Sequence, residues 1–352
     1  MLDCPPGSQV SGGPALTKHA PSPRRAEGDP AGTARVAVLI PCHNEAATVG
    51  KVVADFALAL PDAGIWVFDN ASADDTAGAA EAAGALVRHA PLRGKGNVVR
   101  RMFADVEADV YVLVDGDDTY DADAAPMLVR RLIDEGLDMV SAARVSSHAE
   151  AFRAGHRIGN RALSGVVRLI FGRQFTDMLT GYRVFSRRFV KSFPAHSTGF
   201  EIETELTVHT LQMRLPSAEI ETAYGARPDG SASKLDTVRD GLRILRMIGL
   251  LVREERPLQF FGVAGLAAAA LAGLLAAPVV IHYLHTGLVP RFPSLIVAVG
   301  MALVALLCFA CGLVLDTVSR ARLEQRRLAY LALPGSAALA AVDVRPLRTV
   351  AR

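Results

Sequence analysis

The sequence has few cysteines and little surplus of charge of either sign, and both shortages exclude whole classes of protein. Its 352 residues carry a formal net charge of +2, whereas a general nucleic-acid-binding protein usually carries a strong basic surplus. The four cysteines are too scattered for a zinc site or a disulfide framework. Cys308 and Cys311 lie in an apolar run and fit one face of a helix. Without a disulfide framework, the main domain is expected in a reducing compartment.

Residues 1–33 lack both hydrophobic periodicity and the apolar stretch of a cleavable signal peptide. They are rich in proline, glycine, serine and alanine, a composition typical of disorder. We therefore expect a disordered tail over this segment.

Short apolar runs alternate with helical segments between residues 35 and 143. Apolar runs of four to eight residues predict buried strands. Their alternation with helices predicts a mostly parallel sheet with helices on both faces. The predicted strands are Arg35–Ile40, Ile65–Asp69, Ala85–Arg88, Val110–Asp115 and Asp138–Ala143, and the predicted helices are Glu45–Leu60, Asp74–Ala83, Lys95–Val106 and Met127–Glu135.

Polar clusters follow three of the predicted strands, at Cys42–Glu45, Asp69–Asn70 and Asp115–Asp118. Ligands of such sheets bind beyond the carboxyl ends of the strands. Asp115 and Asp117 flank a glycine, and two carboxylates in this arrangement can hold a hard divalent cation. Such a cation would stabilise a diphosphate as a leaving group. Because acidic turns after strands are common, this pair alone does not decide the function.

The turns taken together resemble those of the family-2 glycosyltransferases. Their sequences are Pro41-Cys42-His43-Asn44-Glu45, Asp69-Asn70-Ala71-Ser72-Ala73-Asp74-Asp75-Thr76, Arg93-Gly94-Lys95-Gly96-Asn97 and Asp115-Gly116-Asp117. The resemblance implies a GT-A fold that binds a nucleotide-diphosphate sugar, with Mg²⁺ or Mn²⁺ held by Asp115 and Asp117. It implies nucleotide binding by Pro41, Asn44, Glu45, Asp69, Ser72, Lys95, Gly96 and Asp115. It also marks Asp117 as catalytic, although Thr119 stands where several members have a glutamine.

Missing residues weigh against two related readings. A dinucleotide-binding turn needs a third glycine where Val99 stands. The processive synthases of the same superfamily carry a Q-x-x-R-W motif, and the only tryptophan here is Trp66, in the second predicted strand. A polymer-extruding role is therefore disfavoured.

The second half of the chain resembles the dolichyl- and undecaprenyl-phosphate sugar transferases. Phe175–Arg183 (FTDMLTGYR) looks like their acceptor-side motif, and Tyr224–Lys234 (YGARPDGSASK) resembles their Y-x-x-R-x-x-G-x-S-K segment. The resemblance implies that the lipid phosphate is bound by Arg144, Arg157, Arg227 and Lys234. Arg183 is a further candidate clamp and catalytic residue.

The catalytic role of Asp177 is left open among three alternatives: orienting the acceptor, acting as a base, or positioning Arg183. A phosphate monoester has a second pKa of about 6 and is already anionic near neutral pH. Such a nucleophile needs little help from a base.

Long apolar segments follow the predicted catalytic domain and predict a membrane anchor. Residues 260–284 and 295–315 are nearly free of charge, and about 21 helical residues cross a hydrocarbon core of roughly 30 Å. Before them, 235–257 alternates leucine with arginine, as in an amphipathic helix on an anionic membrane. Arginines on both outer flanks predict a cytoplasmic catalytic domain. A soluble surface helix and a buried hairpin are the alternatives.

The sequence thus predicts five parts: a disordered tail over 1–33, a catalytic domain over 34–234, an amphipathic juxtamembrane helix over 235–257, two membrane spans within 258–317, and a basic cytoplasmic tail over 318–352. The predicted function is inverting, metal-dependent transfer of a hexose from a donor of the UDP-glucose or GDP-mannose type to a polyprenyl phosphate, at the cytoplasmic face of the inner membrane. A transferase with another lipid or protein acceptor and a non-catalytic nucleotide-binding membrane scaffold are the alternatives. The sugar and a homo-oligomeric state are left open.

Overall fold

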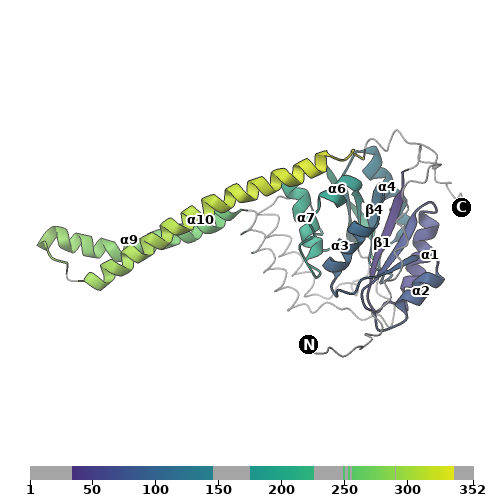
Figure 1. Ribbon diagram of the computed structural model, residues 1–352, viewed down its shortest axis with the longest axis horizontal. Coiled ribbons are helices and arrows are strands. Elements are labelled where there is room, and N and C mark those ends of the chain that lie inside the picture. The colour runs from purple at the N-terminus through teal and green to yellow at the C-terminus, as the bar shows by residue number, and fades with distance from the viewer. Residues whose placement is uncertain are drawn as a thin grey trace, which may run out of the picture.

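The computed structural model describes residues 34–145, 175–225, 256–289 and 291–336, together with Gly249 and Arg253. These residues form a sheet domain and a long helical hairpin that projects from it (Figure 1). The predicted tail over 1–33 and most of the predicted amphipathic helix over 235–257 lie outside the described residues.

The strands of the described chain form one seven-stranded sheet, which bears out the predicted fold class. Their order is β3-β2-β1-β4-β6-β5-β7, and all neighbouring pairs are parallel except the two that involve β6. The strands are β1 Val36–Cys42, β2 Gly64–Asp69, β3 Leu86–His89, β4 Val110–Leu113, β5 Met139–Val145, β6 Arg183–Ser186 and β7 Ser217–Ala223. The antiparallel β6 therefore makes this a mixed sheet.

Helices cover both faces of the sheet and close two apolar cores. In β1, Ala37 and Leu39 belong to one core, whereas Val38 and Ile40 belong to the other. This alternation follows from the two-residue period of a strand, and burial of both faces explains why β1 is apolar throughout. The helices are α1 Val49–Ala59, α2 Thr76–Ala82, α3 Lys95–Asp105, the 3₁₀ turn η1 Ala122–Ala124, α4 Ala125–Asp134, α6 Arg187–Ser192 and α7 Ile202–Met213.

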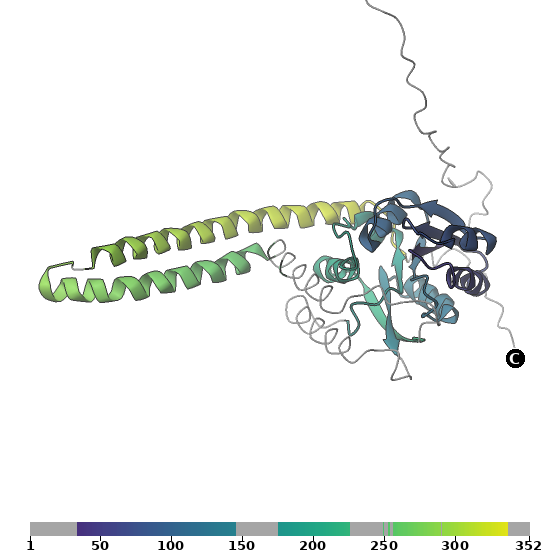
Figure 2. The same ribbon diagram turned by 90° about the horizontal axis from the view of Figure 1, so that it is seen from below.

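Two long helices, α9 (Pro257–Thr286) and α10 (Phe292–Leu331), lie side by side and extend away from the sheet (Figures 1 and 2). Both have the length and composition of a membrane span, with mean hydropathies of 2.2 and 2.7 in their most apolar windows. Most of their side chains point outward, for example Leu266 and Leu307, which are 66% and 63% exposed. The predicted spans fall inside these two helices, which are candidate membrane spans.

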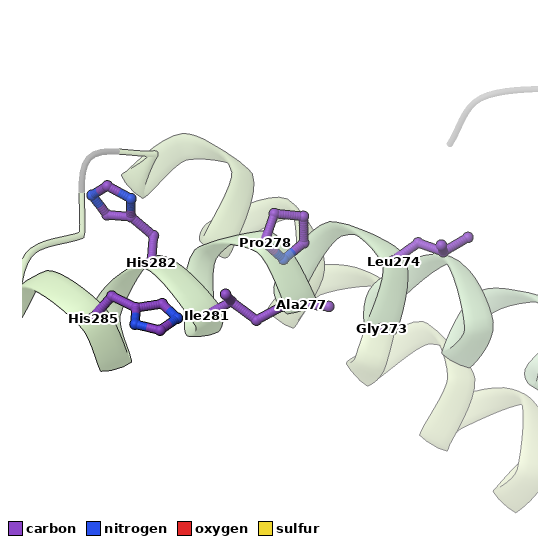
Figure 3. A pocket seen from close by; sticks show the side chains of 7 residues that line it. All are labelled: Gly273, Leu274, Ala277, Pro278, Ile281, His282 and His285. Atoms are coloured by element: carbon purple, nitrogen blue, oxygen red, sulfur yellow. The ribbon is translucent and has the colours of Figure 1, made fainter.

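A shallow depression lies on α9 beside Pro278 and is mostly apolar (Figure 3). It is lined by Gly273, Leu274, Ala277, Pro278, Ile281, His282 and His285. Because it lies on the hairpin and not at the carboxyl ends of the strands, it is no part of the predicted site.

The helix α10 runs past residue 318, where the sequence predicted a basic tail to begin, and docks on the sheet domain. The Tyr330 hydroxyl donates to Asp138 Oδ2 at 2.7 Å, and the Arg188 guanidinium lies 4.5 Å from the Tyr330 ring centroid. Arg188 also donates to Asp138, whose side chain is fully buried. Leu323 packs against the core of the domain. Residues 318–331, which lie in the segment predicted as a basic tail, therefore continue α10 and dock on the sheet domain.

The docking contact predicts a measurable stability effect. We expect Tyr330→Phe to lower the free energy of unfolding by about 1.5 kcal/mol, because it removes a hydrogen bond to a charged, buried acceptor. This corresponds to a melting temperature lower by about 3 °C in detergent solution. Tyr283→Phe is the matched control, since the Tyr283 side chain is 50% exposed on the hairpin. Equal melting temperatures for both variants would show that the Tyr330 contact adds no stability.

Candidate functional site

The turns that follow β1 and β2 are held together by hydrogen bonds between their own residues. Asn44 has a φ of 52°, a left-handed conformation that asparagine tolerates better than most residues. Its N–H donates to Ser72 Oγ at 2.9 Å, and its Oδ1 accepts the N–H of Ala73 at 2.7 Å. The N–H of Glu45 donates to Thr76 Oγ1 at 2.9 Å. Asn44, Glu45 and Ser72, all predicted to bind the nucleotide, therefore lie together.

The other predicted nucleoside contacts lie at the same strand ends. Pro41 is in β1 and pairs with Phe68 of β2. Asp69 ends β2, is 6% exposed, and accepts the N–H of Ser72 at 3.2 Å. His89 Nδ1 lies 3.3 Å from its other oxygen. The Asp69 carboxylate thus holds the backbone of the second turn through its hydrogen bond with Ser72.

Asn70, which the sequence did not predict as a site residue, ties the second turn to the loop before α3. Its amide donates to the carbonyls of Ala90 and Leu92 at 2.8 and 2.7 Å, and its Oδ1 accepts the N–H of Gly94 at 2.7 Å. These bonds fix the position at which α3 begins.

Lys95, the first residue of α3, lies between two carboxylates. Its Nζ is 2.5 Å from Asp115 Oδ1 and 2.6 Å from Glu203 Oε1. Gly96 lets the start of α3 lie against the loop before α7, because a Cβ there would lie 2.2 Å from the Ser197 carbonyl oxygen. Burial alone would lower the pKa of Lys95, but the two carboxylates outweigh it and raise the pKa. Lys95 is therefore a charged, buried ammonium.

The Asp115–Asp117 turn is pinned to the elements around it. A Cβ at Gly116 would lie 2.5 Å from Cys42 Sγ and 2.6 Å from Glu45 Oε2, so this turn packs closely against the end of β1 and the first turn. The Thr48 hydroxyl donates to the Gly116 carbonyl at 2.7 Å. Asp117 is 4% exposed and accepts the Thr119 hydroxyl at 2.6 Å. Thr119, at the position where several members of the resembled family have a glutamine, thus orients Asp117.

The two carboxylates of this turn fit a cation whose remaining coordination positions are filled by a substrate. Among the residues that the structure describes, no three His, Cys, Asp or Glu side chains converge on one cation position. Asp115 and Asp117 therefore supply two carboxylates at most. Mg²⁺ is commonly held by one or two carboxylates together with substrate phosphates.

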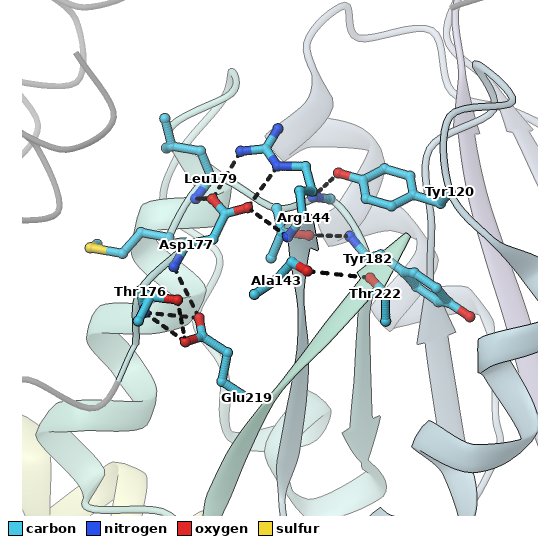
Figure 4. Close-up of polar contacts among 12 residues, drawn as sticks. Tyr120, Ala143, Arg144, Thr176, Asp177, Leu179, Tyr182, Glu219 and Thr222 are labelled. Carbon is cyan, nitrogen blue, oxygen red and sulfur yellow. Dashed lines mark hydrogen bonds and ion pairs between the residues drawn. The ribbon is translucent and has the colours of Figure 1, made fainter. Parts of the chain in front are cut away.

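The acceptor-side loop touches the metal turn directly. A Cβ at Gly181 would lie 2.2 Å from Asp115 Oδ2, so the loop backbone lies directly against that carboxylate. The Tyr120 hydroxyl accepts the N–H of Gly181 at 2.8 Å. On the far side of the loop, Glu219 accepts the N–H groups of Thr176 and Asp177 at 2.7 to 3.0 Å (Figure 4). The motif therefore lies at the strand ends, beside the predicted metal turn.

Asp177 pairs with Arg144, not with Arg183. Arg144 Nε donates to Asp177 Oδ2 at 2.7 Å and its Nη2 to Oδ1 at 2.9 Å, a two-pronged contact (Figure 4). The Arg144 guanidinium also lies 5.4 Å from the Tyr224 ring centroid. Among the described residues, Asp177 therefore makes its direct two-pronged contact with Arg144, and its charge acts on Arg183 only at longer range. Arg157, Arg227 and Lys234, the other predicted phosphate ligands, lie outside the described residues.

Arg183 lies in the core beneath the loop and is 1% exposed. Its guanidinium donates to the carbonyls of Met178 and Thr180 at 2.7 and 3.2 Å and to Thr207 Oγ1 at 2.8 Å. Burial lowers its pKa. These contacts support the loop backbone from within, which corrects the predicted role of Arg183 as a clamp on substrate phosphate.

Comparison with known proteins agrees with this geometry. Residues 37–193 match the model of glycosyl transferase family 2. Glycosyltransferase AglJ of Haloferax volcanii is 35% identical over 240 residues, which cover 67% of this chain and 78% of AglJ. The chain belongs to glycosyl transferase family 2.

Two further relatives of this family-2 glycosyltransferase bear on its substrates and fold. A dolichyl-phosphate hexose transferase of Haloferax volcanii is 28% identical over 222 residues, 63% of this chain and 95% of that protein. The crystal structure of glucosyl-3-phosphoglycerate synthase from Mycobacterium tuberculosis with Mn²⁺, uridine diphosphate and glucosyl-3-phosphoglycerate superposes with a TM-score of 0.51 at 26% identity. That match covers 62% of this chain and 79% of the synthase. The predicted family, GT-A fold and enzyme class are confirmed.

The contact of Gly181 with Asp115 predicts that one methyl group added at position 181 lowers activity. We expect Gly181→Ala to lower sugar transfer by about 100-fold, because the added Cβ must displace the Asp115 carboxylate or the loop. Gly50→Ala is the control, since a Cβ there meets its nearest atom at an ordinary 3.6 Å. Initial rates and thermal unfolding of both variants check this. Full activity of a folded Gly181→Ala variant would show that the loop does not need this close approach.

Proposed function

We propose that this family-2 glycosyltransferase transfers a hexose from a nucleotide-diphosphate sugar to a polyprenyl phosphate. One observation carries the proposal: the acceptor-side loop lies against the carboxylate of Asp115, in the turn that would face the donor diphosphate. Donor and acceptor motifs, which are far apart in the sequence, therefore share one edge of the sheet. A bound sugar between them would face both groups of residues.

The lipid nature of the acceptor is supported by the hairpin and by one relative. A polyprenyl phosphate is confined to the membrane, and α9 and α10 would hold the site near the membrane surface. The relative named as a dolichyl-phosphate hexose transferase aligns over 63% of this chain. Arginines on the outer flanks of both helices favour a cytoplasmic sheet domain.

On the donor side, Asp115 and Asp117 would hold Mg²⁺ or Mn²⁺. Such a cation neutralises the charge that develops on a departing diphosphate. Thr119 fixes the orientation of Asp117, and Lys95 adds a positive charge at the same place. Pro41, Asn44, Glu45, Asp69, Ser72 and Gly96 would line the nucleoside side.

On the acceptor side, Arg144 would bind the lipid phosphate, and Asp177 would orient Arg144 through its two-pronged contact. Arg157, Arg227 and Lys234 would add positive charge, which offsets repulsion between two anionic substrates. A phosphate oxygen then forms a bond to the anomeric carbon as the bond from that carbon to the diphosphate breaks. Attack from the opposite face inverts the configuration, and no strong base is needed.

Radiolabelled sugar transfer tests this proposal directly. We expect label from UDP-glucose or GDP-mannose to pass to undecaprenyl phosphate in the presence of Mg²⁺ or Mn²⁺. Asp117→Ala is expected to lower the rate by at least about 100-fold, because one of two cation ligands is lost. Asp123→Ala is the matched control, since this aspartate is exposed in the η1 turn.

A panel of acceptors separates the proposal from its rivals. Diacylglycerol offers a hydroxyl without charge, and a phosphate-free polyprenol offers the same tail without the phosphate. We expect neither to accept label at more than about 1% of the rate with undecaprenyl phosphate, because Arg144 would lose its anionic partner. Preferred transfer to a neutral lipid would overturn the acceptor assignment, and undiminished transfer by Asp117→Ala would overturn the cation assignment.

A further inference from the structure

The two carboxylates that hold Lys95 differ in their access to solvent. The side chains of Lys95 and Glu203 are 8% and 9% exposed, whereas that of Asp115 is 25% exposed. A substrate or a cation can therefore reach Asp115 more easily than Glu203. Glu203 contacts the same ammonium from the inner side, at 2.6 Å.

A cation at Asp115 would compete with Lys95 for the same carboxylate. Lys95 Nζ lies 2.5 Å from Asp115 Oδ1, so a divalent ion bound to that oxygen would meet the ammonium at close range. The repulsion between the two positive charges favours departure of Lys95 from Asp115. An ammonium has three donors, so Lys95 can keep Glu203 while it turns another donor to a diphosphate oxygen.

Glu203 is well placed to remain fixed while Lys95 moves. It lies in the first turn of α7, and the loop before this helix is clamped from two sides. Glu205 accepts the N–H groups of His196 and Ser197, both at 2.8 Å. The Arg100 guanidinium donates to the Ala195 carbonyl at 2.6 and 2.8 Å. The helix start therefore offers a rigid anchor.

We propose that Glu203 is a positioning residue that draws Lys95 away from Asp115 when a divalent cation binds, and so presents Lys95 to the donor diphosphate. This inference rests on the proposed cation role of Asp115 and Asp117. It assigns Glu203 an effect on the cation that acts through Lys95. Without Glu203, Asp115 is the one carboxylate that remains in contact with Lys95 among the described residues, and Lys95 blocks the cation more strongly.

Mn²⁺ binding to the donor-free, full-length chain in detergent tests this coupling. Free Mn²⁺ is measured by electron paramagnetic resonance for the wild type, Glu203→Gln, Lys95→Met and the double variant. We expect Glu203→Gln to weaken Mn²⁺ binding by about tenfold, because the lysine then competes harder for Asp115. In the Lys95→Met background, the same substitution should change the affinity by less than about twofold, since no competitor remains.

The control variant is Glu201→Gln, which removes the same charge at the start of the same helix. We expect it to leave Mn²⁺ affinity within about twofold of the wild type. A further readout is binding of uridine and guanosine diphosphates with saturating Mn²⁺. Lys95→Met should weaken the preferred diphosphate by about tenfold while it tightens binding of Mn²⁺ alone.

The outcomes separate the inference from the function on which it rests. An equal loss from Glu203→Gln in both backgrounds would mean that Glu203 acts by its own charge, and would overturn the inference alone. Mn²⁺ binding that is absent, or that survives Asp117→Ala unchanged, would overturn the proposed cation site and the inference with it. Thermal unfolding of each variant confirms that the affinities belong to folded protein.

Discussion

The contact of Lys95 with Asp115 and Glu203 is the constraint on which the rest of the site depends. It joins the start of α3, the turn after β4 and the start of α7, so these three segments must meet within hydrogen-bonding distance. Loss of one partner of such a buried charge costs several kcal/mol, because the remaining charge is left without compensation. This explains the close backbone approaches nearby. A Cβ on Gly96 would lie 2.2 Å from the Ser197 carbonyl oxygen, and a Cβ on Gly181 would lie 2.2 Å from Asp115 Oδ2.

The antiparallel strand β6 explains how the acceptor loop reaches the same place. In a parallel sheet, the residues before a strand lie at the edge opposite to the site. Because β6 runs against β4, with Arg183 beside Leu113, the loop before β6 arrives at the carboxyl end of β4. Arg183 then anchors this loop from the core through the Met178 and Thr180 carbonyls. One reversed strand thus brings the acceptor motif to the donor turn.

The sequence predicted those strands and turns that have a recognisable pattern within a few consecutive residues. The strands β1, β2 and β4 are continuous apolar runs, and the turns after them carry recognisable polar spacing. It did not predict β6, which is four residues long, or β7, where only Thr222 is buried and polar residues alternate with apolar ones. The roles of Arg183 and Glu203 were missed for another reason. A local sequence pattern shows that a residue is charged. How deeply that residue is buried and which groups it contacts depend on segments that are distant in the chain.

The helical hairpin of α9 and α10 is connected to the candidate site through β5, although the two share no residues. The docked end of α10 contacts Asp138, which immediately precedes β5, whereas Arg144 lies near the other end of that strand. A strand rises about 3.3 Å per residue, so the two points are roughly 20 Å apart along a rigid element. Since α10 is one continuous helix from the apolar segment to Leu331, its docking fixes the height and tilt of Arg144 relative to the hairpin. For the proposed polyprenyl phosphate acceptor, whose phosphate lies at a set depth in the bilayer, this geometric coupling would hold Arg144 at the depth of the phosphate.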